Sequence, residues 1–282
     1  MFFTLGLILI NVALILIVEK YYNKPYNNIP INDQDEIFIL ADSHGLPLKQ
    51  NLRESGIYNF AIGSDSYFDI YRKIVYLIKY TNMNKIIITA DDHTLSIYRE
   101  NSNNIDRSVK FIDYNDNDFL LENNYSLMKE KYLKRYLPIF NTKTTGIVEG
   151  FFRSMFKKPK VRSLDWDSFE NKKKASKARA KLQFKGTNSS ERLKSCIKEI
   201  VNLCKLQNIK IIAIKYPLSK DYLTEVNGRN FGADEYFAEL GIKTYDFTKI
   251  YINNDEYFAN QDHLNDLGGK KFADELKKRL NL

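Results

Sequence analysis

Apolar and polar residues alternate along this chain in a pattern that predicts short buried strands separated by longer amphipathic helices. Five short runs are almost wholly apolar and rich in β-branched residues, as expected for strands that helices cover on both faces. These runs are Glu36–Ala41, Ile57–Ala61, Lys85–Ala90, Ile209–Lys215 and Ile242–Phe247.

Longer segments between these runs carry apolar residues at three- and four-residue spacing, which is typical of helices that bury one face. The predicted helices are Leu46–Glu54, Ser66–Tyr80, Ser189–Gln207 and Asn265–Leu280. Strands that alternate with helices indicate a parallel sheet with crossover helices. The sequence therefore predicts one α/β domain over residues 36–282, with a flavodoxin-like, doubly wound sheet of about five parallel strands.

The third and fourth predicted strands lie much farther apart than one crossover helix requires, so residues 100–186 are predicted to be an insertion. Its second half is basic: residues 151–186 hold twelve Lys and Arg side chains against three acidic ones, and the whole chain has a net charge of +8. The basic segment fits either contact with an anionic polymer or lipid headgroup, or a solvated helical face. We expect it to border a site at the carboxyl edge of the sheet.

The N-terminus begins with an apolar run, Phe2–Val18, that is broken by only three small or polar residues. Its length suits a short membrane span, and it is too unpatterned for a surface helix. No basic residue precedes it, and no small-residue cleavage site follows it, as a signal peptide would need. We therefore expect an uncleaved single-pass membrane anchor over residues 1–20, followed by a polar linker over residues 21–35.

The orientation of this anchor stays open. Lys20 and Lys24 follow the apolar run while only the α-amino group precedes it, which by the positive-inside rule favours a cytoplasmic C-terminal domain. The function considered below favours an extracytoplasmic domain instead.

Three polar motifs are predicted to meet at the carboxyl edge of the sheet, where α/β domains bind their ligands. Asp42-Ser43-His44 follows the first strand, and Gly63 follows the second. His263 comes just before the last helix, within the segment 260–265.

In these motifs the chain resembles the SGNH (GDSL-like) hydrolase superfamily, in particular a bacterial membrane-anchored branch related to proteins of surface polysaccharide O-acetylation and teichoic acid D-alanylation. Asp42-Ser43-His44 is similar to the first sequence block of that family and Gly63 to the glycine of the second. His263-Leu264-Asn265 with Gly268 is similar to the block that carries the family's histidine. The resemblance covers residues 36–100 and 187–282.

The resemblance makes Ser43 the nucleophile and His263 the base that activates it. A serine hydroxyl is a weak nucleophile and needs a neighbouring imidazole to accept its proton. The main-chain N–H groups of Ser43 and Gly63 are the expected donors to an oxyanion. Singly, Ser43 fits a helix cap and Gly63 fits a tight turn equally well, and it is the combination with His263 that favours catalysis.

Two positions depart from the family pattern. The family places Asp three residues before the histidine, and Asn260 stands there in this chain. We expect Asn260 or Asp262 to orient His263, and a Ser–His dyad supported by a main-chain carbonyl is a third alternative. Asp91 or Asp92 occupies the place of the family's oxyanion asparagine, where a carboxylate would repel the developing charge, so we expect these residues to orient another group.

No metal or other cofactor is expected. His44, Asp92 and His93 could approach one cleft, but no pair of histidines has the spacing of a metal motif. Nucleic acid is not an expected partner either, because no recognised module or aromatic platform accompanies the basic segment.

These observations predict a serine esterase or O-acyltransferase that acts on acyl esters, with acetyl as the expected acyl group, of a cell-surface polysaccharide. The expected partners are an acylated glycan and the membrane, and a membrane acyltransferase is a further candidate partner. The alternative is a catalytically inactive scaffold or glycan-binding subunit of a polysaccharide modification system, which the departures at Asn260, Asp91 and Asp92 favour.

Overall fold

The chain folds into two compact units in a computed structural model, which describes residues 2–27, 29, 31–113, 129–141, 143–156 and 169–281. The N-terminal unit comprises Met1–Pro30 and Ile105–Val161, and the sheet unit comprises Ile31–Asn104 and Arg162–Leu282. The predicted insertion 100–186 is therefore divided between the two units. Its larger part, residues 105–161, belongs with the N-terminal residues, a grouping that hydrophobic pattern alone does not reveal.

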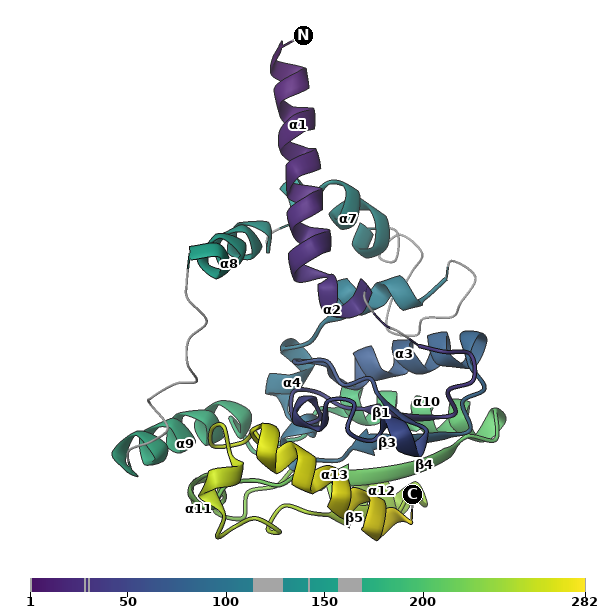
Figure 1. The fold of residues 1–282 in the computed structure, drawn as a ribbon, viewed down its shortest axis with the longest axis vertical. Helices are drawn as coiled ribbons and strands as arrows, with labels where there is room; N and C mark the ends of the chain where they lie inside the picture. The colour runs from purple at the N-terminus through teal and green to yellow at the C-terminus, as the bar shows by residue number, and fades with distance from the viewer. Residues whose placement is uncertain are drawn as a thin grey trace. The chain divides into compact units, whose positions relative to one another are not determined.

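The sheet unit contains five parallel strands in the order β2-β1-β3-β4-β5 (Figure 1). The strands are β1 (Ile37–Leu40), β2 (Ile57–Asn59), β3 (Lys85–Thr89), β4 (Lys210–Lys215) and β5 (Thr244–Asp246). All five fall inside the predicted apolar runs, which confirms the prediction of an α/β chain with a five-stranded parallel sheet.

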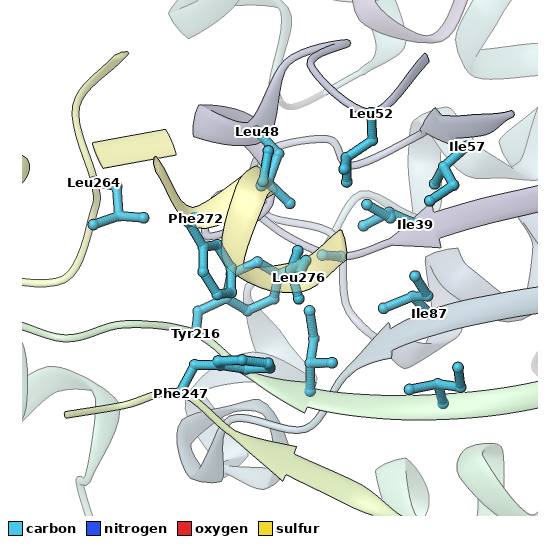
Figure 2. Packing of buried hydrophobic residues seen from close by; sticks show 14 of the residues in the cluster. Ile39, Leu48, Leu52, Ile57, Ile87, Tyr216, Phe247, Leu264, Phe272 and Leu276 are labelled. Carbon is cyan, nitrogen blue, oxygen red and sulfur yellow. The ribbon is translucent and has the colours of Figure 1, made fainter. Parts of the chain in front are cut away.

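One face of the sheet is buried beneath the last helix, α13 (Asp266–Leu280). The register pairs Ile39 with Ile87 and Ile87 with Ile212, so these side chains point to the same face. Figure 2 shows Phe272 and Leu276 of α13 packed among them in a core that is almost wholly apolar. Strand residues that alternate with these point to the opposite face, on the side of α3 (Tyr67–Tyr80) and α10 (Glu191–Leu206), which pack against one another.

The helices of the sheet unit begin at polar caps that the sequence supplies. The Asp69 carboxylate accepts the N–H of Ser66 at the start of α3, and the Ser190 hydroxyl accepts the N–H of Leu193 at the start of α10. The Asn265 side chain accepts the N–H of Gly268 at the start of α13. Each cap satisfies a main-chain donor that has no partner within its helix. The other described α-helices of the unit are α4 (Ile97–Asn101), α9 (Phe169–Gln183), α11 (Lys220–Val226) and α12 (Ala233–Glu239).

The α-helix predicted over Leu46–Glu54 is wrong. The segment forms two short 3-10 helices, η2 (Leu46–Leu48) and η3 (Arg53–Ser55). Between them Lys49 has a positive φ of 48°, which no α-helix contains. The apolar spacing that suggested a helix instead places Leu48 and Leu52 in the core (Figure 2).

Close packing of α13 on η2 leaves no space for a side chain at Gly269. A Cβ added there would overlap the Pro47 carbonyl group, whereas a Cβ at Gly146 of the helix α8 (Thr144–Phe156) would meet nothing within 4 Å. We expect Gly269→Ala to lower the free energy of unfolding by about 1–3 kcal/mol or more. Gly146→Ala is the matched control and should be neutral or slightly stabilising. Urea denaturation of the full chain in detergent measures both, and equal stability of the two variants would contradict the packing.

The N-terminal unit is built around one apolar helix. The helix α1 (Phe2–Ile17) continues through a π-helical turn, η1 (Val18–Tyr22), and the short helix α2 (Lys24–Asn27) follows. The predicted polar linker is thus partly helical. Among the residues that the structure describes, Thr4–Tyr22 is the one helical stretch long and apolar enough to cross a membrane.

The other helical segments that the structure describes in this unit are shorter than α1. They are α5 (Ile105–Ser108), η5 (Val109–Phe111), η6 (Lys129–Leu133), α7 (Lys134–Tyr136), η7 (Pro138–Phe140) and α8.

Candidate active site

Ser43 lies in a tight turn directly after β1. The Gly45 N–H donates to the Asp42 carbonyl oxygen at 3.2 Å, and the Asn59 side chain donates to the Gly45 carbonyl oxygen at 2.8 Å. A Cβ on Gly45 would come within 2.7 Å of the Ala61 Cβ and 2.9 Å of the Ala41 Cβ. Only glycine therefore lets this turn pack against Ala41 and Ala61, which follow β1 and β2, and the turn leaves Ser43 partly exposed.

His263 contacts Ser43 although it lies 220 positions later in the chain. Its Nε2 atom lies 2.8 Å from Ser43 Oγ, within hydrogen-bond distance. An antiparallel bridge between Phe258 and Leu264 closes the loop that carries the histidine, and Asn265 then caps α13. In this geometry an imidazole can take the proton of a serine hydroxyl.

Two side chains compete for the second nitrogen of the His263 ring. Asn260 Oδ1 lies 2.8 Å from Nδ1 in a hydrogen bond, and Asp262 Oδ1 lies 3.0 Å from the same atom as an ion-pair neighbour. Since the amide oxygen can only accept, Nδ1 carries the proton and Nε2 is free to accept the hydroxyl proton of Ser43. Both residues that the sequence left as alternatives therefore contact the histidine.

Gly63 leaves open space beside the serine. A Cβ at Gly63 would lie 3.9 Å from the Ser43 Cβ and 3.6 Å from Leu46 Cδ1, which is ordinary van der Waals distance. Its φ is not positive, so the backbone conformation does not require glycine. Within the described part of the chain, the N–H groups of Ser43 and Gly63 donate to no protein acceptor. Both donors are thus available to a ligand.

Asp91 and Asp92, which stand at the place of the family's oxyanion asparagine, each contact a neighbouring donor or cation. Asp91 is buried after β3, where Oδ1 accepts the N–H of Tyr216 at 2.8 Å and Oδ2 lies 2.7 Å from His44 Nδ1. Asp92 forms an ion pair with Lys215 at 2.8 Å. A carboxylate avoids the site of a developing negative charge, and here each is held by a cation or donor instead.

His44 is the centre of a buried charge cluster beneath the candidate pair. Burial alone would lower the pKa of His44, but the Asp42 and Asp91 carboxylates and the Asp262 carboxylate raise it to about 10. Its Nε2 lies 3.6 Å from Asp262 Oδ2, and its ring centroid is 5.1 Å from that of His263. His44 is therefore an imidazolium at neutral pH.

Two arginines complete the charge cluster. Arg179 of α9 donates from Nε to Asp262 Oδ2 at 2.7 Å, and Arg99 Nη2 lies 3.8 Å from Asp42 Oδ2. Burial would raise the pKa of the Asp262 carboxyl, yet His263, His44 and Arg179 hold it well below its usual range. Three carboxyl groups thus face three cationic side chains, which gives the buried cluster a balanced charge. We call these six residues the charge cluster: Asp42, His44, Asp91, Arg99, Arg179 and Asp262.

No protein-family model matches the chain, and no curated protein matches it significantly.

Sequence reasoning missed most of the charge cluster. Asp42 was noted only as part of the Asp42-Ser43-His44 motif and His44 also as a possible metal ligand, and Arg99 and Arg179 were not singled out as site residues. An available signal was the presence of Asp and His at the ends of both β1 and β3, in Asp42-Ser43-His44 and Asp91-Asp92-His93. Charged residues directly after two buried strands indicate that these side chains pair with one another or with other charged groups.

Two groups of side chains in this region have the proximity of metal ligands. They are Asp42, His44 and His93, and His44, Asp262 and His263, with ligand atoms within 4.8 Å of one another in each group. His44 belongs to both groups and is protonated at neutral pH, so its ring nitrogens act as donors there. A cation would have to displace that proton and join carboxylates that His44, Arg99 and Arg179 already neutralise.

Part of the basic segment borders the histidine loop. Lys172 forms an ion pair with Asp255 at 2.8 Å, and Arg179 pairs with Asp262. Other lysines of α9, such as Lys173, Lys174 and Lys177, are exposed. Residues 157–168 of the segment lie outside the described residues. The basic segment thus contributes a half-buried arginine, Arg179, which contacts Asp262 beside His263, together with a solvated face.

The two contacts of His263 Nδ1 lead to a ranked prediction. We expect Asn260→Ala to lower esterase turnover by roughly ten- to a hundredfold, because the ring loses the acceptor that fixes its tautomer. Asp262→Ala should lower turnover less and stability more, since it leaves Arg179 without its carboxylate and removes one of the carboxylates near His44. Steady-state kinetics and urea denaturation of both variants separate the effects. A larger loss of turnover for Asp262→Ala in a folded protein would assign the orienting role to the carboxylate.

Proposed function

We propose that the chain is a serine esterase or O-acyltransferase of the SGNH type. The observation that carries this proposal is the hydrogen-bonded series from Ser43 Oγ to His263 Nε2, and from His263 Nδ1 to Asn260 Oδ1. The strand order 2-1-3-4-5 is that of flavodoxin-like doubly wound sheets, in which ligands bind at the carboxyl edge. Ser43, Gly63 and the histidine loop all belong to that edge.

The proposed reaction begins when Ser43 Oγ attacks the carbonyl carbon of an acyl ester. His263 Nε2 takes the hydroxyl proton as the new C–O bond forms, and the N–H groups of Ser43 and Gly63 donate to the oxyanion. Collapse of the tetrahedral intermediate breaks the ester bond, and the imidazolium returns the proton to the departing alcohol oxygen. Water or a glycan hydroxyl then attacks the acyl-enzyme by the same steps in reverse.

In a Ser-His-Asp triad one aspartate both orients the histidine and stabilises its charged form, and here Asn260 and Asp262 divide these two roles. The amide of Asn260 accepts the Nδ1 hydrogen and fixes the tautomer, but it carries no charge to stabilise an imidazolium. The ionised Asp262 carboxylate, 3.0 Å from Nδ1, supplies that charge. His44 and Arg179 keep Asp262 ionised although it is buried.

The proposed substrate is an acyl ester, with acetyl as the leading candidate, on a cell-surface polysaccharide. A tethered enzyme with an open serine site suits a large acylated glycan better than a freely diffusing metabolite. The proposal places the sheet unit outside the cytoplasm, anchored by α1, where a membrane acyltransferase would be a natural partner. An inactive glycan-binding scaffold with the same fold is the second candidate, favoured by the amide at Asn260 in place of a carboxylate.

A serine-directed fluorophosphonate tests the proposal directly. The reagent phosphonylates a serine only where a base and an oxyanion site activate it. We expect mass spectrometry to find the adduct on Ser43 of the full chain in detergent and to find none in His263→Ala. Ser64→Gly is a matched control, because Ser64 is a neighbouring exposed serine whose φ of 70° suits glycine. Labelling of Ser64→Gly should be unchanged, and an unlabelled Ser43 in the intact chain would favour the scaffold.

A further inference from the structure

Beyond the apolar helix α1 and its continuation η1, exposed apolar side chains of the N-terminal unit are concentrated in one described segment. Residues 129–156, which we call the collar, comprise η6, α7, η7 and α8. Nine large apolar side chains of the collar are exposed to solvent: Tyr132, Leu133, Tyr136, Leu137, Ile139, Phe140, Phe152, Met155 and Phe156. Phe156 is 82% exposed and Phe140 is 70% exposed. The described residues of the sheet unit, a far longer stretch, expose seven such side chains in scattered places.

The collar packs directly on the apolar helix α1. Figure 1 shows α7 and α8 beside the C-terminal half of this helix, and both α8 and η7 contact it. Asn11 donates from its side chain to the Tyr136 carbonyl oxygen at 2.9 Å. The rings of Tyr21 and Phe151 lie 5.8 Å apart in an edge-to-face contact. The collar therefore follows α1 from its middle to its C-terminal end.

The contact at Asn11 sets the depth of the collar. Asn11 precedes Val18 by seven residues, which is ~10 Å along a helix that rises about 1.5 Å per residue. If α1 spans a membrane, the chain at Tyr136 lies inside the apolar layer and not in water. Tyr136 also supplies the acceptor that a polar Asn11 side chain needs at that depth.

Charged side chains of the same unit lie beside the C-terminal end of α1, whereas the Asn11 contact lies near the middle of that helix. Arg135 pairs with Glu19 at 2.9 Å, Arg107 donates to the Tyr22 carbonyl oxygen at 3.2 Å, and Lys110 donates to that of Tyr26 at 2.7 Å. With Lys131 and Lys134 they line a small cavity in which Asp106 is the acidic residue. Cations at the end of a span face the layer of lipid phosphates.

We propose that the collar is a membrane-embedded element, which lies around α1 at the boundary between headgroups and acyl chains. Its apolar side chains are buried in lipid, and the five cations contact the phosphate layer above them. The lipid bilayer is thus what covers the exposed apolar surface of the collar, because the collar packs on α1, a helix that is long and apolar enough to cross a bilayer. The inference rests on the proposed anchoring by α1, and the test separates the two.

Quenching of tryptophan fluorescence by brominated lipids tests the proposal in the full chain. The only tryptophan, Trp166, is replaced by Phe, and single tryptophans are introduced by Leu9→Trp, Phe140→Trp, Phe156→Trp and Leu206→Trp. Leu206 is the matched control, since it is a 78% exposed apolar residue of the sheet unit. Each variant is reconstituted in vesicles of phosphatidylethanolamine and phosphatidylglycerol whose acyl chains are brominated near the headgroup or near the bilayer centre.

We expect bromine near the headgroup to remove more than about half of the emission at positions 140 and 156, and little at position 206. Bromine near the centre should quench position 9 most. Strong quenching at position 9 without quenching at 140 and 156 would overturn the collar and leave the anchor intact. Absence of quenching at position 9 would remove the anchor and the collar together. Ile139→Trp and Phe152→Trp replace any collar variant that fails to fold.

Discussion

Ser43→Ala is expected to lower hydrolysis of a small acetyl ester by at least about a thousandfold, and His263→Ala should do the same. The two side chains form one unit, because Nε2 can take a proton only from the hydroxyl that it contacts at 2.8 Å. The double variant should therefore lose no more than a few-fold beyond either single variant. Steady-state kinetics with a chromogenic acetyl ester measure all three.

The pattern of losses separates catalysis from simple binding. Multiplicative losses in the double variant would show that the two residues act independently and would contradict the proposed pair. Ser64→Gly removes a neighbouring hydroxyl and should keep full activity. Circular dichroism and elution volume should match those of the wild type in every variant, since Ser43 and His263 are both partly exposed.

His44→Gln is expected to lower the free energy of unfolding by about 3–5 kcal/mol at neutral pH, because it leaves the Asp91 carboxylate buried without its cation and leaves Asp262 with Arg179 as its nearest cation. The loss should depend on pH. The pKa of His44 is raised from 6.5 in the unfolded chain to about 10 in the fold, so the folded state binds the extra proton between these values. The stabilisation is complete below pH 6.5 and disappears as the pH rises through about 10.

Urea denaturation of the full chain in detergent at several pH values between 6.5 and 10 checks this prediction. The wild type should lose stability across that range, and His44→Gln should lose much less. His93→Gln is the control: burial lowers the pKa of His93, so its contribution changes only as the pH falls below 6.5, and between pH 6.5 and 10 its profile should run parallel to that of the wild type. Parallel pH profiles for the wild type and His44→Gln would contradict a buried imidazolium.

The strands and the candidate pair were predictable because their signals are local or have a fixed place in the topology. Each strand is an apolar run that helices cover, and parallel strands deliver their carboxyl ends to one edge. Ser43 and Gly63 follow two such strands, and His263 precedes a helix whose cap, Asn265, is visible in the sequence. The parallel direction of the strands was therefore enough to predict that these residues lie at the same edge of the sheet.

The charge cluster could not be predicted in the same way. Whether Asp262 is buried depends on Arg179 and Gln183, which come from a helix 83 and 79 residues away in the chain. Nothing in a run of lysines and alanines distinguishes the one arginine that turns inward. The short helices η2 and η3 were misjudged for a related reason, since core contacts with α13 override the helical spacing of Leu46–Glu54.

Ser43 and His263 are 220 positions apart, and they meet because α13, the last helix, packs against η2 just after β1. The order of synthesis therefore controls when the site exists. A ribosome that has made the serine, the sheet strands and the whole N-terminal unit has still made no nucleophile–base pair. His263 meets Ser43 only once α13 has emerged and packed against η2, so a chain interrupted before α13 would lack the proposed base beside Ser43.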